Sequence, residues 1–260
     1  MTRHRGKFNK DKVEPYELSR SRIENFIQCP ACFYMQQVEG ISFPSIPGYN
    51  INEATDVLLK KDFDNFRGKD KTHPFLIKKG YKNLIPFKHE HFELWTQSLH
   101  FGAENRLNFD HKETNLRIGG GLDDVWINIE TKKLHIVDYK STSQKKDNGP
   151  ITLEDKWKSS YKRQMDLYTW ILLKKGFDVD KTGYFLYCDG NRFTNKSFLL
   201  SENAIMEFKI TLIPYMTNFS WIEQTLKDIF LTLRLTKRPK HSSICEYGIL
   251  FEKSLSQFID

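Results

Sequence analysis

Apolar side chains recur at spacings of three, four and seven residues in several stretches of the chain, which is the pattern of amphipathic helices. One stretch starts at Ser19 or Ser21 and ends at Gly40. Pro30 lies inside it, so we expect a kink or two short helices. The other stretches cover residues 52–66, 159–175 and 221–235. The pattern thus predicts helical segments in the first quarter, the middle and the last part of the chain.

Short apolar runs between turn-forming residues predict strands. The predicted strands cover residues 116–129 and 133–139, joined by a turn in 128–133, and then 184–188, 193–200 and 207–215. We expect 184–188 and 193–200 to form a hairpin that turns at 189–191. Residues 67–92 look irregular, and 94–109 suggest short strands and turns. Because helices flank a central block of strands, the predicted class is α/β, with a mixed sheet.

Composition narrows the kind of protein. Hydrophobic residues make up 39% of the 260 residues, which supplies a sizeable core and excludes wholesale disorder. We expect a basic N-terminal arm over 1–18, one domain over 19–240 and a C-terminal tail over 241–260. The sequence has no apolar run long enough to cross a membrane and no apolar signal core, so we expect a cytoplasmic protein. The net charge of +7 suits a polyanionic partner, but it equally suits ordinary solubility.

The cysteines leave two interpretations open. Cys29 and Cys32 form a C-x-x-C, a spacing found in metal and redox sites. The later cysteines, Cys188 and Cys245, form no second C-x-x-C, because Gly248 stands where one would place its second cysteine. The pair at 29 and 32 is therefore either packing on a helix or part of a four-cysteine cluster.

Two acidic residues on the predicted strands are candidates for chemistry. Strand alternation puts Asp138 and Lys140 on one face of their strand. If the turn centres on residues 130 and 131, Asp123 lies opposite Asp138, with Cβ atoms about 5 Å apart. Two such carboxylates repel each other unless a cation lies between them, and oxygen ligands suit Mg²⁺ or Mn²⁺. Asp124 is a rival ligand, but alternation turns it to the opposite face.

Other side chains fit chemistry on a phosphate. Lys140 would hold an attacking water or offset charge in the transition state, and the glycines at 119–121 would let a nucleic-acid backbone approach. On the following helix Gln164 and Tyr168 share a face, with Arg163 beside them, and these groups can bind phosphate oxygens. A charged surface hairpin and an ordinary core helix would produce the same residues, so the pattern alone leaves that alternative open.

Four motifs, in order, resemble the RecB-like branch of the PD-(D/E)XK nuclease superfamily. The opening helix of that branch is similar to residues 21–34, which end in Cys-Pro and an aromatic pair. Its metal-ligand strand resembles 120–123 (Gly-Gly-Leu-Asp), and its core motif resembles 136–141 (Ile-Val-Asp-Tyr-Lys-Ser). Its Q-x-x-x-Y helix resembles 164–168.

The resemblance implies a restriction-endonuclease-like core, a mixed sheet flanked by helices, and hydrolysis of DNA that depends on Mg²⁺ or Mn²⁺. By position it implies that Asp123 and Asp138 bind metal and that Lys140 is the catalytic lysine. The backbone carbonyl of Tyr139 completes the metal shell in this scheme. Gln164 and Tyr168, with Arg163, would bind or orient the substrate.

Two positions depart from that pattern. Asp56 falls near the place where relatives carry an early-helix metal ligand, although an exposed acid on a helix looks the same. Relatives with an iron–sulfur cluster use one cysteine before the core and three after it, whereas only Cys188 and Cys245 follow it here, so we expect no such cluster.

The predicted function is a metal-dependent DNA nuclease in repair, recombination or defence. One alternative is a nucleic-acid-binding module that keeps the fold without hydrolysis. The other is a small metal- or cluster-binding interaction protein built on Cys29 and Cys32.

Overall fold

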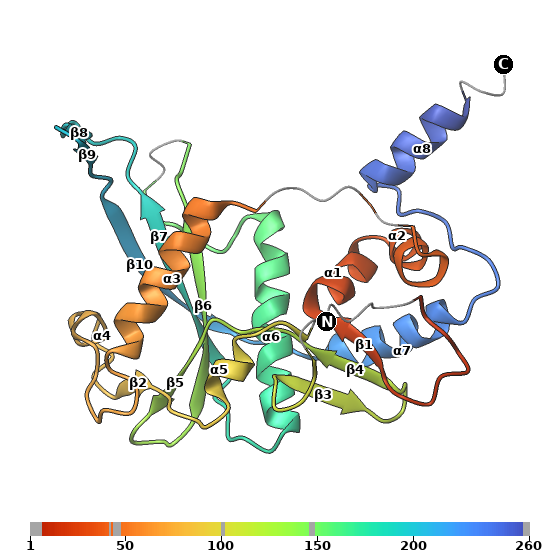
Figure 1. The fold of residues 1–260 in the computed structure, drawn as a ribbon, viewed down its shortest axis with the longest axis horizontal. Helices are drawn as coiled ribbons and strands as arrows, with labels where there is room; N and C mark the ends of the chain where they lie inside the picture. The colour runs from red at the N-terminus through yellow and green to blue at the C-terminus, as the bar shows by residue number, and fades with distance from the viewer. Residues whose placement is uncertain (1–6, 42, 44–47, 100–101, 146–148, 257–260) are drawn as a thin grey trace.

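A five-stranded mixed sheet forms the centre of the protein (Figure 1). The computed structural model describes residues 7–41, 43, 48–99, 102–145 and 149–256. The strand order is β10-β7-β6-β5-β2, with β6 and β7 parallel and the other neighbours antiparallel. The strands are β2 (Leu84–Pro86), β5 (Asp124–Asn128), β6 (Leu134–Thr142), β7 (Thr182–Gly190) and β10 (Phe208–Met216).

Helices cover both faces of this sheet. Helix α6 (Ser159–Lys174) lies on one face and α3 (Asn50–Asp64) on the other (Figure 1). Ile136 of β6 belongs to the core on the α6 side, whereas Val137 and Tyr139 pack with Phe63 of α3. Because both faces are covered, residues 134–139 are all buried, as expected for an inner strand of a covered sheet.

A smaller sheet lies beside the central one and continues its core. Its order is β1-β4-β3, with β1 (Tyr16–Ser19) parallel to β4 (Leu116–Gly119) and β3 (Asn108–His111) antiparallel to it. Leu18, Leu116 and Ile118 from this sheet share one core cluster with α6 and with α7 (Ile222–Leu233).

The opening helical segment is broken, as Pro30 predicts. It consists of α1 (Arg20–Gln28), α2 (Pro30–Tyr34) and the π-helical turn η1 (Met35–Glu39), which ends at Gly40 with a positive φ of 75°. Cys29 at the break has an extended conformation, and Pro30 takes the first helical position, where its missing N–H is not needed.

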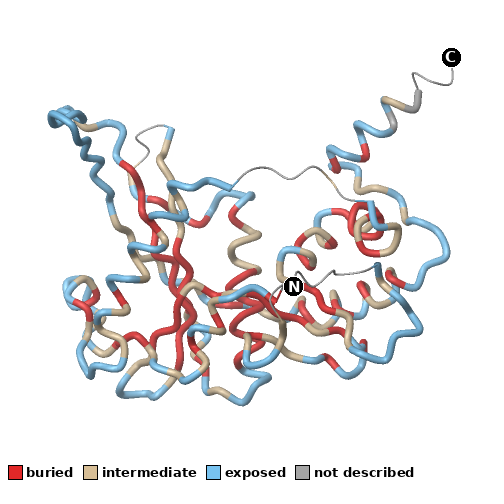
Figure 2. The backbone as a smooth tube through the Cα atoms, in the orientation of Figure 1, coloured by how far each residue is buried: buried red, intermediate tan, exposed pale blue. Residues whose placement is uncertain are grey.

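Short elements complete the fold. They are α4 (Pro74–Lys78), α5 (Phe92–Trp95), the 3₁₀ turn η3 (Lys156–Lys158), the small hairpin β8 (Leu199–Leu200) and β9 (Asn203–Ala204), and α8 (Glu246–Ser256). The β8–β9 hairpin and α8 project from the body at opposite ends and are mostly exposed (Figure 2). Among the described residues, no helix is long and apolar enough to cross a membrane.

Most of the predicted elements are confirmed, and so is the α/β class with a mixed sheet and flanking helices. The segments predicted at 159–175, 221–235 and 207–215 correspond to α6, α7 and β10. Residues 67–92 contain more structure than expected, since α4 and β2 lie within them. The expected domain limit at residue 18 falls inside β1, and the expected tail from 241 begins with a side chain that contacts Cys29.

Two strand predictions were wrong. The expected strand over 116–129 is divided at residues 120–123 into β4 and β5, which belong to different sheets. The expected hairpin of 184–188 with 193–200 does not form, because β7 pairs along its whole length with β10 instead. The nine residue pairs of β7 and β10 leave 193–200 in the projecting connection, where its apolar side chains are exposed.

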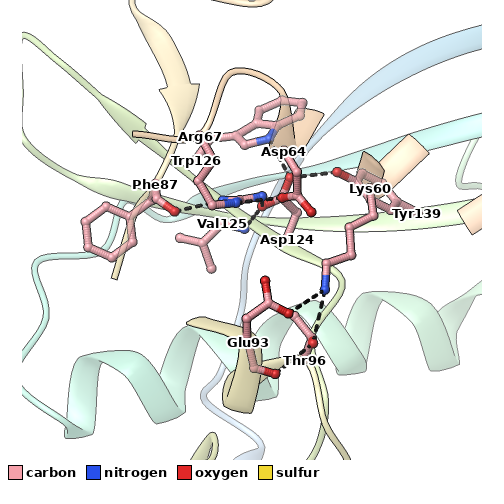
Figure 3. Close-up of polar contacts among 10 residues, drawn as sticks. All are labelled: Lys60, Asp64, Arg67, Phe87, Glu93, Thr96, Asp124, Val125, Trp126 and Tyr139. Carbon is pink, nitrogen blue, oxygen red and sulfur yellow. Dashed lines mark hydrogen bonds and ion pairs between the residues drawn. The ribbon is translucent and has the colours of Figure 1, made fainter. Parts of the chain in front are cut away.

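A buried ion pair fixes the α3 face of the sheet at Asp124. The side chain of Asp124 is 0% exposed and accepts a hydrogen bond from Arg67 Nη2 at 2.7 Å (Figure 3). The Tyr139 hydroxyl donates to the same carboxylate at 2.6 Å, and Trp126 Nε1 donates at 3.2 Å. Arg67 also bonds Asp64 and stacks over the Phe92 ring, 3.8 Å from its centroid. The segment after α3 is thereby fixed to β5 and β6.

We expect Arg67→Met to lower the free energy of unfolding by about 3–5 kcal/mol, because it leaves the Asp124 carboxylate buried without its cation. Urea unfolding measures the change. The matched control is Lys227→Met, which breaks an ion pair to Glu113, a side chain 61% exposed, and should leave the free energy of unfolding nearly unchanged. Equal losses in the two variants would contradict this account.

Candidate active site

The register of β5 and β6 brings two carboxylates together. Asp124 pairs with Val137 and Val125 with Ile136, so one further step of the same register sets Asp123 opposite Asp138. Asp123 Oδ2 accepts the backbone N–H of Tyr139 at 2.8 Å, which ties it directly to β6. The turn is thus centred where the sequence predicted, on residues 130 and 131.

Lys140 lies one pleat beyond Asp138 on the same face. Its Nζ is 2.5 Å from Asp138 Oδ2 and donates a hydrogen bond to the Tyr139 carbonyl at 3.2 Å. Burial alone would lower the pKa of Lys140, but the carboxylates of Asp138 and Asp123 overcome it and raise the pKa above its usual value. The ammonium therefore stays charged at neutral pH.

The pKa of Asp123 is also raised, which in a carboxyl group favours the uncharged form. Burial first, and then repulsion from Asp138, raise the pKa of Asp123 to about 8, although the Lys140 cation and the Tyr139 N–H oppose the rise. The folded protein therefore holds a proton that the unfolded chain releases at the ordinary aspartate pKa of 3.8. The stabilising contribution of this carboxyl is complete at acid pH and is lost as the pH rises towards about 8.

Gln164 joins this site to the opening helix. Its amide nitrogen donates to Asp138 Oδ1 at 2.6 Å, and its amide oxygen accepts from Arg20 Nη2 at 2.6 Å. Because the two ends of the amide bond partners of opposite polarity, the orientation of Gln164 is fixed. Sequence reasoning missed Arg20, whose only signal was its place at the start of the opening helix.

Asp56 reaches the same end of β6 from α3, on the other face of the sheet. The Ser141 hydroxyl donates to Asp56 Oδ1 at 3.2 Å. Burial raises the pKa of Asp56, and it is close enough to Lys140 and Asp138 for their charges to act on it. The structure thus brings Asp56 to the edge of the carboxylate site.

Arg163 has a different place. Its guanidinium makes two hydrogen bonds to Glu24 of α1, at 2.8 and 2.6 Å. It lines a shallow cavity with Asp166, Tyr215 and Trp221 and is not hydrogen-bonded to the carboxylate site. Arg163 thus links α6 to α1, and it is Gln164 that contacts Asp138.

The glycines at 119–121 serve internal packing. A Cβ on Gly119 would lie 2.3 Å from the Leu107 carbonyl oxygen, and one on Gly121 would lie 2.5 Å from that of Thr96. A Cβ on Gly120 would lie 2.6 Å from the Tyr168 hydroxyl. Other parts of the protein therefore fill the space beside these glycines. The expectation that a nucleic-acid backbone approaches them was wrong. Burial raises the pKa of Tyr168 well above its usual value, so this hydroxyl stays protonated beside the site.

A cavity opens next to Lys140. It has a volume of about 440 Å³ and is lined by Tyr187, the register partner of Lys140, and by Lys145, Trp157 and Lys158. The Trp157 side chain is 59% exposed and packs edge-on against Tyr161, whose ring lies 4.9 Å from Lys140 Nζ. The exposed groups of this lining include Trp157 and Lys145, whereas Lys158 is buried and pairs with Asp155, which also lines the cavity.

A known protein family matches most of the chain. The PD-(D/E)XK nuclease superfamily matches residues 76–247, about two thirds of the chain. The chain belongs to the PD-(D/E)XK nuclease superfamily. No curated protein matches it. Membership in this nuclease superfamily makes the protein a phosphodiesterase by class, with a nucleic acid as its substrate.

The PD-(D/E)XK superfamily usually uses a divalent metal ion, and the site has suitable donors. Asp138 Oδ2 is buried and accepts no hydrogen bond among the described residues, so its negative charge is balanced only by the Lys140 ion pair. Asp123 faces it, and the Tyr139 carbonyl and Asp56 lie at the same strand end. Two facing carboxylates and a carbonyl oxygen, with Lys140 as the neighbouring cation, fit a hard cation.

A second group of metal-type side chains lies elsewhere. Cys29, Cys32 and Cys245 meet His241, and their ligand atoms all lie within 4.8 Å of one another. Sequence reasoning missed His241 because it searched for a fourth cysteine, whereas the spacing His-x-x-x-Cys at 241–245 was the available signal. Cys188 belongs to β7 and to neither site, and burial raises its pKa to about 11.

If Asp123 is a metal ligand, Mn²⁺ affinity should rise by roughly tenfold per pH unit between about pH 6 and pH 8, because the ion would then displace the proton of Asp123. Isothermal titration in buffers of different ionisation enthalpy measures both the affinity and the proton released, about one per ion. Asp123→Asn should bind more weakly and lose the slope. An affinity that does not change with pH in the wild type would rule out this role of Asp123.

Gly120→Ala should destabilise the fold by about 1–3 kcal/mol, since the new methyl group overlaps the Tyr168 hydroxyl. Adding Tyr168→Phe removes the overlapping oxygen and should recover at least about 0.5 kcal/mol. Thermal or urea unfolding of the two single variants and the double variant gives the coupling. Gly48→Ala is the control, because nothing lies within 4 Å of a Cβ there. If the changes in unfolding free energy of the two single variants simply add in the double variant, the proposed overlap at Gly120 with the Tyr168 hydroxyl is excluded.

Proposed function

We propose that the protein is a Mg²⁺- or Mn²⁺-dependent deoxyribonuclease of the RecB-like branch, active in repair, recombination or defence. The observation that carries the proposal is the convergence of Asp123, Asp138 and Lys140 at one end of β5 and β6, with Gln164 bonded to Asp138. In a chain of this nuclease superfamily, that set provides two acidic ligands and a cation beside them.

Each residue has a role that follows from its contacts. Asp123, Asp138 and the Tyr139 carbonyl would hold the metal, with Asp56 as a further ligand from α3. A divalent ion held there would supply polarisation of the phosphodiester and a more acidic water. Lys140 stays protonated and stabilises the negative charge that develops on the phosphate. Gln164 is a positioning residue, because it holds the Asp138 carboxylate in place from α6.

The cavity beside Lys140 supports a nucleic-acid strand as substrate. Stacking of bases on an exposed aromatic ring and attraction of phosphates to lysines are the usual features of such a path, and Trp157 and Lys145 provide both. The net charge of +7 favours the same class of ligand. DNA is the proposed substrate, and the cytoplasm remains the predicted compartment.

The opening helix, which supports the RecB-like assignment by its resemblance to that branch, lies outside the matched residues 76–247. Helix α1 contacts α6 through Arg20 with Gln164 and through Glu24 with Arg163. The helix that resembles the opening motif thus lies against the helix that carries the Q-x-x-x-Y motif.

We expect Asp138→Asn to lose both Mn²⁺ binding and DNA cleavage, and Lys140→Ala to keep metal binding while cleavage falls by about 10²- to 10³-fold. Cleavage of single- and double-stranded DNA, with titration of Mn²⁺ by calorimetry, measures both. Lys181→Ala is the control, since this exposed lysine precedes β7 at the opposite end of the sheet.

Cleavage that survives Asp138→Asn in a carefully purified preparation would overturn the proposal. Folded wild-type protein that binds DNA without metal, with a steep salt dependence and no cleavage, would favour the binding module instead.

A further inference from the structure

Two segments more than 200 residues apart converge on the opening helices. Cys29 lies at the break between α1 and α2, Cys32 lies within α2, and His241 and Cys245 precede α8. The three thiols are buried, and the apolar neighbours of the cluster are Ala31 and Phe43. Such a concentration of sulfur and imidazole in one buried place needs an explanation that packing alone does not give.

The distances match a single tetrahedral ion. Cys29 Sγ lies 3.4 Å from His241 Nδ1, and the thiol sulfurs of Cys32 and Cys245 each lie 3.6 Å from it. Cys32 Sγ and Cys245 Sγ are 3.4 Å apart. With Zn–S bonds of about 2.3 Å and Zn–N bonds of about 2.0–2.1 Å, the edges of a tetrahedron are about 3.6–3.8 Å long. Four of the six distances between ligand atoms are thus close to these edges, and the two from Cys29 Sγ to the other sulfurs are at most 4.8 Å, so the four atoms are grouped closely enough to bind one zinc ion.

Backbone groups around the sulfurs fit thiolates. The N–H of Ser242 donates to Cys29 Sγ at 3.5 Å, and the N–H of Gly248 donates to Cys245 Sγ at 3.4 Å. Such outer hydrogen bonds orient thiolate ligands and offset their charge. Gly248 also leaves room for His241, because a Cβ at position 248 would lie 2.5 Å from the Cβ of His241. Only glycine lets the imidazole lie this close to α8.

We propose that Cys29, Cys32, His241 and Cys245 form a structural Cys₃His zinc site, separate from the carboxylate site. An iron–sulfur cluster spreads its ligands over two or more iron atoms, whereas all four ligand atoms here lie within 4.8 Å of one another. All four positions are filled by protein, which is the arrangement of a structural zinc site and not of a catalytic one.

The site attaches the C-terminal segment to the helix that supports Gln164. Other contacts join the same two segments. Arg238 makes two hydrogen bonds to Glu39, and the Tyr34 hydroxyl donates to the Leu235 carbonyl. Cys29 directly follows α1, and Arg20 at the other end of α1 bonds Gln164. Zinc therefore fixes the end of α1 that is remote from the carboxylates.

The first test is the metal content of the full chain, purified under reducing conditions without chelator. We expect one zinc per chain and none of the visible absorption of an iron–sulfur chromophore. Replacement by Co²⁺ should give the visible bands of a tetrahedral ion and the near-ultraviolet bands of thiolate ligation. A chain with iron and sulfide, or one that binds neither zinc nor cobalt, would overturn the proposal.

Variants assign the ligands. Cys245→Ser should weaken zinc binding by more than about 100-fold, since even the loss of an outer-shell partner costs 10- to 100-fold. His241→Cys keeps four ligands and should retain one zinc while its cobalt bands shift. Cys188→Ser is the matched control, because this buried cysteine lies in β7, and it should keep full zinc. Loss of zinc in Cys188→Ser, or full zinc in Cys245→Ser, would contradict the assignment. Zinc binding by Asp138→Asn at wild-type level would separate this site from the proposed nuclease centre.

Discussion

The repulsion between Asp123 and Asp138 is the constraint around which the structure is organised. Two carboxylates on facing strands are unfavourable in a buried place unless positive charge and hydrogen bonds offset them. Lys140, the Tyr139 N–H and the Gln164 amide supply these, and each depends on a different element for its position. Asp138 is buried and its two charged neighbours are only partly exposed. Burial and the charge of Asp138 therefore raise the pKa of Asp123, whereas burial would lower the pKa of Lys140 but the two carboxylates raise it.

Asp123 and Asp124 show how adjacent residues of one type serve opposite purposes. Strand alternation turns Asp124 to the α3 face, where Arg67, Tyr139 and Trp126 satisfy its carboxylate completely. Asp123, one residue earlier, faces the α6 side with a single backbone donor and a like charge opposite. Asp124 therefore stabilises the sheet, whereas Asp123 has few hydrogen-bond donors and a raised pKa.

Helix α1 connects the two parts of the molecule that carry chemistry. Its first residue, Arg20, orients Gln164 beside the carboxylates, and Glu24 holds Arg163 one turn further along. The cysteine that follows it meets the C-terminal segment. The short helix alone would be marginal, since nine residues provide few internal hydrogen bonds, so its position depends on contacts at both ends.

The sequence by itself determined the elements with strong periodicity, including α6, α7 and the break at Pro30, because these depend on local spacing. It also determined which acids share a face, since alternation along a strand is a local property, and the turn at 130–131 then fixed the register. Only the tertiary structure decided three contacts, because helix packing sets them. They are the hydrogen bonds of Asp56 with Ser141, of Arg163 with Glu24 and of Arg20 with Gln164. The same holds for the pairing of β7 with β10 and for the meeting of Cys29 with His241, 212 residues later. Contacts over such separations depend on how the elements pack around the common core, and no local pattern in the chain specifies that packing.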